Sequence, residues 1–352
     1  MKPSILFKLL LQTYAYPREA THKGANHKGD EKGFTLLEAL VASIMGAIVV
    51  VLGLEGYMQI RRLIAEEHIT NDVQQRLRIA MINLGQDIQQ AGELLPDAGT
   101  LNAIEIGGTN NTLLVVRKGI PGVNPQMIQS CVALNANTFN MLLVAHETGC
   151  SYRSPGEIDR NNNTIPDVLE TWEAVRRGRP EGKWRIYILD RNNNRDQFFV
   201  YARSNQSTAA SVHPGGTSNS LPRIWFEGQW QNDYAQNNTW VYAIEERRYR
   251  LRGNSTDGFN LELIVNGDNN NPFTLVERIR NINVTANPPA NGTNVRTNCD
   301  RTSFTVTIEA LPPRDVYPQV LLGWNDTRRR EKFTLQQTFV PRNYDRCWFV
   351  MR

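Results

Sequence analysis

Glu38 is an acidic side chain near the start of a long apolar segment. Residues 39–54 carry no charge, and Ser43 is their only polar side chain. A carboxylate at the head of such a segment is costly in an apolar environment unless a second group neutralises it. We therefore expect Glu38 to have a specific partner, and the residues that precede it indicate which one.

The residues before Glu38 form a short motif together with it. Residues 32–38 read KGFTLLE, a basic residue followed by Gly, Phe, Thr, two Leu and Glu. By this motif the chain resembles the type IV prepilins, a family in which a prepilin peptidase cuts after the glycine and usually methylates the new N-terminal phenylalanine. The resemblance implies cleavage after Gly33 and N-methylation of Phe34. Gly33 suits this role because a residue without a side chain fits an extended backbone into a narrow protease cleft.

The resemblance also implies how Glu38 is used. Cleavage would leave a positive amine on Phe34 at the end of an apolar helix, where an unpaired charge is costly and a paired one sets register. Glu38 can neutralise that amine in the same or a neighbouring subunit, and the family places the partner on the adjacent subunit of a filament. The sequence departs from the family in its long leader, residues 1–33, and in lacking the helix proline of many major pilins.

The apolar segment, residues 34–60, is long enough to cross a membrane. As a helix it would span roughly 40 Å, against a hydrocarbon core about 30 Å thick. Residues 1–33 hold six Lys or Arg and three Asp or Glu, and this basic surplus favours an N-terminus on the cytoplasmic side. No A-x-A-like site follows the segment, which argues against a secretory signal peptide, whereas a plain membrane anchor stays open.

A second set of residues has the spacing of a calcium-binding loop. Residues 159–170, DRNNNTIPDVLE, place oxygen-bearing side chains at positions 1, 3, 5, 9 and 12. Hard cations such as calcium prefer such oxygen ligands. The match is imperfect, since Thr164 replaces the usual glycine and two ligands are neutral amides; the alternative is a solvated loop whose acids cap a helix at residues 166–175. The candidate ligands are Asp159, Asn161, Asn163, the carbonyl of Ile165, Asp167 and Glu170.

Four cysteines, all after the apolar segment, predict two disulfide bonds. They form no CxxC pair and have no zinc-type spacing with histidine. Four cysteines allow three pairings, and the sequence does not choose between them. The simplest joins sequence neighbours, and four reduced, buried thiols are the alternative. The candidates are Cys131 with Cys150 and Cys299 with Cys347.

The sequence offers little support for catalysis or nucleic-acid binding. It contains no nucleophile elbow, phosphate-binding loop, HExxH motif or dinucleotide fingerprint, so we expect that the protein is not an enzyme. The net charge is only +4 without a long basic run, which disfavours nucleic acid as the main partner. The aromatic-rich residues 224–242 could stack on sugars or single strands, but packing in the core is favoured.

The chain beyond residue 60 predicts a long helix and then a β-rich domain. Apolar residues recur every three or four positions from Val73 to Ala91, which indicates an amphipathic helix in residues 61–95 that ends near Gly92. An antiparallel sheet packed on this helix would give a pilin-like α+β fold. The hairpin formed by residues 184–189 and 197–202 would turn through the Asn-rich residues 190–196. The other expected strands are residues 111–117, 139–145, 240–244, 247–252, 261–265, 303–309 and 332–339.

Two further stretches resemble a subgroup of the same family. Residues 76–92 are similar to the helix end, and residues 332–343 to the last strand, of PilW-type minor pilins and J-type pseudopilins. The resemblance implies a leader of residues 1–33, a transmembrane half-helix of residues 34–60, an amphipathic half-helix of residues 61–95 and a periplasmic or extracellular domain of residues 96–352.

These observations predict a non-enzymatic minor pilin or pseudopilin that primes, caps or decorates a filament. The expected partners are the prepilin peptidase, other pilins or pseudopilins, the inner-membrane assembly platform and the membrane itself. The expected location is the bacterial inner membrane, with the C-terminal domain in the periplasm, and then a pilus or pseudopilus that can reach the cell surface. The alternative is a single-pass, membrane-anchored periplasmic binding protein or enzyme that does not polymerise.

Overall fold

The computed structural model describes most of the chain after residue 34. The described residues are 35–95, 101–108, 113–131, 141–145, 150, 154–178, 184–193, 195–206, 221–236, 238–254, 258–288, 297–299, 302–311, 333–343 and 347–351. The chain divides into two compact units, residues 1–61 and residues 62–352. One element, helix α1 (Leu36–Gln90), has residues in both units.

Helix α1 ends where the sequence predicts. Its last residue is Gln90, and the chain then turns through Gly92, which has φ 78°. Glycine adopts this left-handed conformation without a steric penalty, so it closes the helix. The predicted apolar stripe is confirmed, because its residues form the buried face of α1 in the second unit: Val73, Leu77, Ala80, Met81, Leu84 and Ile88.

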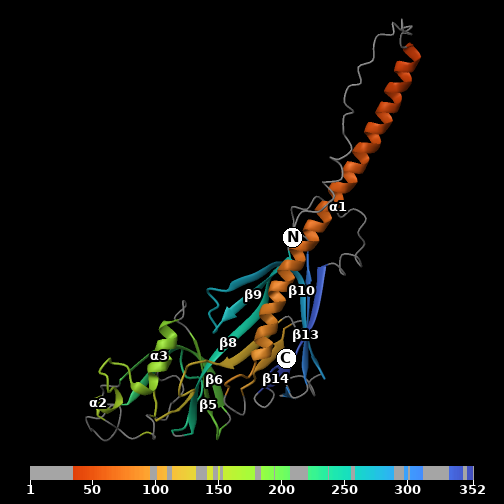
Figure 1. Cartoon of the computed structure of the whole chain (residues 1–352). Helices are drawn as coiled ribbons and strands as arrows, with labels where there is room; N and C mark the ends of the chain where they lie inside the picture. Colours follow the sequence, from red (N-terminus) through yellow and green to blue (C-terminus); the bar gives the residue numbers. More distant parts are fainter. Residues whose placement is uncertain are drawn as a thin grey trace, which may run out of the picture. The chain divides into compact units, whose positions relative to one another are not determined.

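The second unit is built on one large sheet that is almost entirely antiparallel (Figure 1). Its strands are β1 (Ile104–Gly107), β2 (Leu113–Gly119), β3 (Met127–Gln129), β4 (Met141–Leu143), β5 (Trp184–Asp190), β6 (Arg195–Gln206), β7 (Pro222–Glu227), β8 (Thr239–Asn254), β9 (Gly258–Val265), β10 (Phe273–Asn287), β11 (Thr297–Asn298), β12 (Ser303–Ala310), β13 (Thr334–Phe339) and β14 (Trp348–Met351). The only parallel pair among them is β1 with β14. Three short helical elements accompany the sheet: α2 (Pro155–Ile158), η3 (Asp167–Leu169) and α3 (Glu170–Arg177). The chain is therefore α+β, as predicted.

Strand β8 joins two parts of this sheet. Its first half pairs with β5 on one side and β3 on the other, and its second half pairs with β9. From β5 the sheet continues through β6, β7 and β4, and from β9 it continues through β10, β12 and β13. Each part has its own apolar core: α1 packs in one, and Trp172 of α3 packs against Trp184 and Tyr201 in the other.

Several sequence-based strand boundaries were wrong. Residues 240–244 and 247–252 were expected as two strands but form the single strand β8, because the polar pair Glu245 and Glu246 between them is paired with basic residues of β2. Strands β1, β3, β7, β10, β11 and β14 were not expected. Strand β10 was missed because register shifts between Val276 and Asn281 space its buried residues Val276, Ile279 and Ile282 three apart and so break the period of two. The hairpin of β5 and β6 is confirmed, and Asp190 accepts hydrogen bonds from the backbone of Asn192 and Asn193 in its turn.

Two disulfide bonds join the cysteines that are neighbours in sequence. Cys131 is bonded to Cys150, with their Cα atoms 5.2 Å apart. Cys299 is bonded to Cys347, with their Cα atoms 5.3 Å apart, and the Cys299 backbone N–H donates to the Cys347 carbonyl. The second bond therefore links β11 to β14 at one edge of the sheet.

Buried ions connect β2, β5 and β8. The Glu246 carboxylate is buried and lies 2.8 Å from Arg117 Nε and 3.4 Å from both Arg185 Nε and Arg248 Nη2. Arg117 also pairs with Glu105 at 3.1 Å. Burial alone would raise the pKa of Glu246, but the three guanidinium groups together hold this pKa below its usual value.

Replacing Glu246 tests this cluster. We expect Glu246→Gln to lower the free energy of unfolding by about 3–5 kcal/mol, because it leaves buried guanidinium groups without their counter-charge. The folded-state pKa is depressed, so the stability that Glu246 contributes is present above its usual pKa and is lost as pH falls through the folded value. Urea unfolding of both proteins between pH 7 and pH 3 should show a difference that shrinks at the acidic end; a constant difference would contradict the ionic explanation.

A second test concerns the close contact between α1 and β13. A Cβ atom added to Gly85 would overlap the ring of Phe339. Gly85→Ala should therefore lower the free energy of unfolding by about 1–3 kcal/mol, although alanine favours helix. The double variant Gly85→Ala with Phe339→Leu removes the overlapping ring atoms, so urea unfolding should show it to be more stable than the sum of the two single changes implies. Strictly additive losses would contradict the contact.

Candidate membrane-anchoring and assembly site

Thr35 and Glu38 form a capping box at the start of α1. The Thr35 hydroxyl and backbone N–H both donate to Glu38 Oε2, at 3.1 and 3.2 Å, and the Glu38 backbone N–H donates to Thr35 Oγ1 at 3.3 Å. The pair satisfies backbone donors that a helix start otherwise leaves unpaired. Thr-x-x-Glu ahead of an apolar run is the ordinary sequence signature of a capping box, so this helix start was readable from the sequence although it was not among the expectations above. Glu38 therefore has local hydrogen-bonding partners in a single chain.

The apolar part of α1 is exposed along its whole length. Every described side chain from Thr35 to Arg61 is exposed except Gly56, which is intermediate. Leu36 keeps 86% of its surface and Leu54 keeps 58%. By length and composition α1 could cross a membrane, and none of its most apolar stretch is buried within the protein. A helix that is apolar on all sides has to be covered by lipid or by other apolar helices.

Polar groups mark the end of the apolar stretch. The Arg61 guanidinium lies over the Tyr57 ring, 5.6 Å from its centroid. Aromatic and basic residues of this kind are enriched where a helix meets a membrane surface. Within the apolar stretch, the Ser43 hydroxyl donates to the Ala39 carbonyl at 2.8 Å, so the helix itself satisfies this polar group. Gly33 and Phe34, the predicted cleavage and methylation residues, lie outside the described residues.

The predicted calcium loop is folded around its own side chains. Asp159 accepts hydrogen bonds from the backbone N–H groups of Asn163 and Thr164, at 3.0 and 2.7 Å. The amide nitrogens of Asn161 and Asn163 donate to Glu170 Oε1. Thr164 has φ 72°, the left-handed conformation that glycine would adopt at this position without strain. Hydrogen bonds within the loop thus link the ligands predicted at loop positions 1, 3, 5 and 12.

The remaining predicted ligands are less favourable. Asp167 accepts from the Arg160 backbone N–H at 3.1 Å, and its carboxylate lies 3.7 Å from Arg160 Nε, so a neighbouring cation already contacts it. The Ile165 N–H donates to Asn163 Oδ1 at 2.8 Å. Within the described residues, no three His, Cys, Asp or Glu side chains are gathered as a metal site. Calcium binding would thus depend on amide oxygens, and it stays a prediction.

The aromatic residues of residues 224–242 are mainly structural, as expected. Trp230, Tyr234 and Tyr242 are buried, and Trp230 packs edge-on against Phe199 and Phe226. Trp225 and Trp240 are only partly buried, and each has an arginine guanidinium over its ring. Of the three tryptophans in residues 224–242, only Trp225 and Trp240 keep some ring surface that could stack on a ligand.

Calcium titration tests the loop at residues 159–170. If the affinity is in the range of extracellular calcium modules, about 0.1–1 mM, then 10 mM calcium should stabilise the folded state by about 1.4–2.7 kcal/mol. Glu170→Gln should abolish this gain, and Glu67→Gln on the exposed surface of α1 should not. Thermal unfolding with calcium, magnesium or a chelator measures the effect. Equal stability in all three solutions would contradict the prediction.

Comparisons with known proteins assign no family to the chain. No family model, no curated protein and no solved structure matches it. A function has to be argued from the geometry of its own residues.

Proposed function

We propose that this protein is a pilin-like subunit, a minor pilin or pseudopilin, that is held in the membrane by α1 and incorporated into a filament through the same helix. The observation that carries the proposal is the apolar first half of α1, which is exposed on all sides and has an acidic residue, Glu38, in its first turn. The KGFTLLE motif at residues 32–38 supports it, since it supplies a site where processing would create a positive partner for that acid.

The two halves of α1 support different parts of this function. Up to Arg61 no described part of the chain buries the side chains of the helix, so lipid or the helices of other subunits must cover them. From Val73 onwards one face is buried in the core of the second unit. A subunit of this kind can exchange lipid for neighbouring helices while its own domain stays folded.

Side chains of the sheet hold the end of α1 in place, which suits a helix that must bear load in a filament. Asp87 is buried and accepts hydrogen bonds from Arg247 Nη1 at 2.9 Å and from the Tyr249 hydroxyl. Burial raises the pKa of Asp87, and the nearby Arg247 opposes this rise. The Arg342 N–H donates to the Gln89 carbonyl at 2.9 Å. Strand β8 and the segment that follows β13 thus hold the last turns of the helix through hydrogen bonds.

The proposed role is to prime, cap or decorate the filament, as in PilW-type minor pilins or J-type pseudopilins. The size of the domain supports a subunit of low abundance, because residues 62–352 form one large unit. Strand β13 lies where the resemblance to the last strand of that subgroup was noted, and it packs on α1 through Phe339. The proposed partners are the prepilin peptidase, an inner-membrane assembly platform and other filament subunits.

A single-pass anchored protein that does not polymerise is the second candidate. The capping box favours it, because Thr35 satisfies the Glu38 carboxylate without any second subunit. Under this candidate Glu38 serves only the helix start, and its charge is dispensable. The two candidates therefore differ in whether the charge of Glu38 or only its hydrogen-bonding capacity matters.

Charge and capping can be separated by two substitutions. Glutamine also serves in a capping box, so Glu38→Gln removes the charge and keeps the cap. Thr35→Ala keeps the charge and weakens the helix start by about 0.5–2 kcal/mol. The test uses cells that express the tagged protein and the filament machinery, and it measures how much tagged protein is in the filaments sheared from the cells. We expect the Glu38→Gln variant to be absent from these filaments and the Thr35→Ala variant to be present at most of the normal amount.

N-terminal mass spectrometry of the same samples checks processing. The mature protein is expected to begin at Phe34 and to carry a methyl group on its amine. A protein that keeps residues 1–33 in cells with an active prepilin peptidase, or equal filament incorporation of Glu38→Gln and the unchanged protein, would favour the anchored, non-polymerising candidate.

A further inference from the structure

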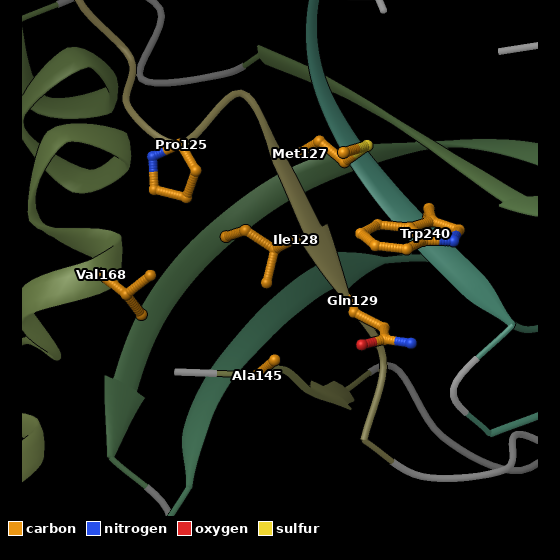
Figure 2. A pocket seen from close by; sticks show the side chains of 7 residues that line it. All are labelled: Pro125, Met127, Ile128, Gln129, Ala145, Val168 and Trp240. Carbon is orange, nitrogen blue, oxygen red and sulfur yellow. The ribbon is translucent and has the colours of Figure 1, made fainter. Parts of the chain in front are cut away.

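A cavity of about 400 Å³ lies beside the short strand β3 (Figure 2). Three consecutive residues of this strand line it: Met127, Ile128 and Gln129. Trp240 of β8 lies on the side of Met127 and Gln129, whereas Val168 of η3 lies on the side of Ile128 (Figure 2). Consecutive strand residues point to opposite faces of a sheet. A cavity that touches all three must therefore lie along the edge of the strand rather than over one face.

The hydrogen-bond pattern shows which backbone groups face this edge. The Ala243 N–H donates to the Gln126 carbonyl at 3.1 Å, and the Ser130 N–H donates to the Thr239 carbonyl at 2.8 Å. In an antiparallel pair, alternate residues turn their N–H and C=O groups toward the partner strand. Gln126, Ile128 and Ser130 thus face β8. The N–H and C=O groups of Met127 and Gln129 point to the opposite edge, where the cavity lies.

Part of this edge already accepts another strand. The Ala145 N–H, just after β4, donates to the Gln129 carbonyl at 2.8 Å, and the Cys131 N–H donates to the Leu143 carbonyl at 2.8 Å. Among the described residues this pairing extends no further than Gln129, and none of them pairs with the outward groups of Met127. An unoccupied length of strand edge is a template for pairing with another chain.

The far wall of the cavity is preformed. The Thr171 hydroxyl donates to the Asn124 carbonyl at 2.9 Å, and Trp172 Nε1 donates to the Pro125 carbonyl at 2.7 Å. These bonds hold η3 and α3 against the turn that leads into β3. Val168 therefore stays opposite Ile128, and little conformational entropy would be lost when a ligand enters.

A positive charge is held next to the cavity. The Arg191 guanidinium lies 5.2 Å from the centroid of the Trp240 ring, and its Nη2 donates to the Tyr242 hydroxyl at 3.1 Å. In the described part of the chain no carboxylate pairs with Arg191, although the residue is exposed. A guanidinium group held in this way is preorganised for an acidic partner.

We propose that the edge of β3 binds an extended, acidic peptide segment of a partner protein by strand addition. The segment pairs with the backbone of Met127. Its alternate side chains lie against Trp240 and Met127 on one face and against Ile128 and Val168 on the other, and a carboxylate beside them meets Arg191. Strand addition obtains affinity from main-chain hydrogen bonds and specificity from pockets for alternate side chains.

A peptide fits this site better than a carbohydrate does. Sugar recognition needs many polar groups around one aromatic ring, whereas the only polar side-chain groups of the lining are the Gln129 amide and the Trp240 indole N–H. The strand edge also supplies a feature that only a peptide backbone can match. The inference does not rest on filament assembly, so either proposal can fail without the other.

Binding can be measured with the full-length protein in detergent micelles and an array of short peptides blocked at both ends. The peptides alternate apolar residues with either aspartate or lysine. We expect the folded protein to bind aspartate peptides more tightly than lysine peptides. Methylating the backbone nitrogens of a bound peptide should abolish its binding, because the peptide can then no longer pair with a strand.

Four substitutions locate the site. Met127→Pro removes an outward N–H at an edge position where proline is tolerated, and Val168→Glu places a charge in the cavity; both should abolish binding. Arg191→Glu should lower the affinity for the aspartate peptide by up to about fivefold and raise the affinity for the lysine peptide. Arg195→Glu, in the same hairpin turn, is the matched control and should change neither affinity. Circular dichroism confirms that each variant is folded.

Any one of four results would overturn the proposal. The first is that no peptide on the array binds the folded protein, which includes the case in which the chain itself fills the cavity. The second is that methylated and unmethylated peptides bind equally well. The third is that Arg191→Glu and Arg195→Glu have the same effect, and the fourth is that neutral oligosaccharides bind in the cavity in place of peptides.

Discussion

The pairing of β2 with β8 is the constraint on which the rest of the second unit depends. Arg117 stands directly opposite Glu246, and Lys118 stands directly opposite Glu245. Because neighbouring strand residues point to opposite faces, these two cross-strand pairs place opposite charges on both faces of the sheet at one position. A register shift by one residue would separate both pairs and would leave buried charges uncompensated.

The two ion pairs serve different neighbours. On one face, Arg117 and Arg185 converge on Glu246 and also lie over the ring of Phe198, so β2, β5 and β6 are tied to β8. On the other face, the Lys118 amine donates to Gln90 in the last turn of α1. Arg247, the next residue along β8, reaches Asp87 of the same helix. The charged strip thus positions the helix as well as the sheet.

Helix α1 has two environments because its sequence has two patterns. From Ala39 to Leu54 the side chains are apolar on every side apart from Ser43, and no described part of the protein buries them. From Val73 the apolar residues occupy one face only, and that face is buried. A helix of this kind needs two different kinds of neighbour, and the second unit supplies only one of them. In the proposed filament subunit, lipid and then the helices of other subunits supply the apolar neighbours of the first half of α1.

The sequence by itself determined the features that depend on local pattern. The period of apolar residues predicted α1 and its end near Gly92, since helix periodicity and glycine closure are local properties. The β5–β6 hairpin followed from two β-type runs around an Asn-rich turn. The joining of neighbouring cysteines was the simplest of three pairings, but only the fold brings Cys299 to Cys347 across 48 residues. Local spacing also predicted the loop at residues 159–170, in which Asn163 donates hydrogen bonds to both Asp159 and Glu170, the first and last predicted ligands.

Tertiary structure alone decided the features that depend on contacts distant in sequence. The two acids of β8 appear to interrupt a strand until Arg117 and Lys118, more than a hundred residues earlier, are placed opposite them. Strand β10 was not recognisable, because register shifts against β9 and β12 break the alternation of its buried residues between Val276 and Asn281. The edge of β3 could not be foreseen at all, since three residues have no readable period and the free side of a strand exists only once its neighbours are in place.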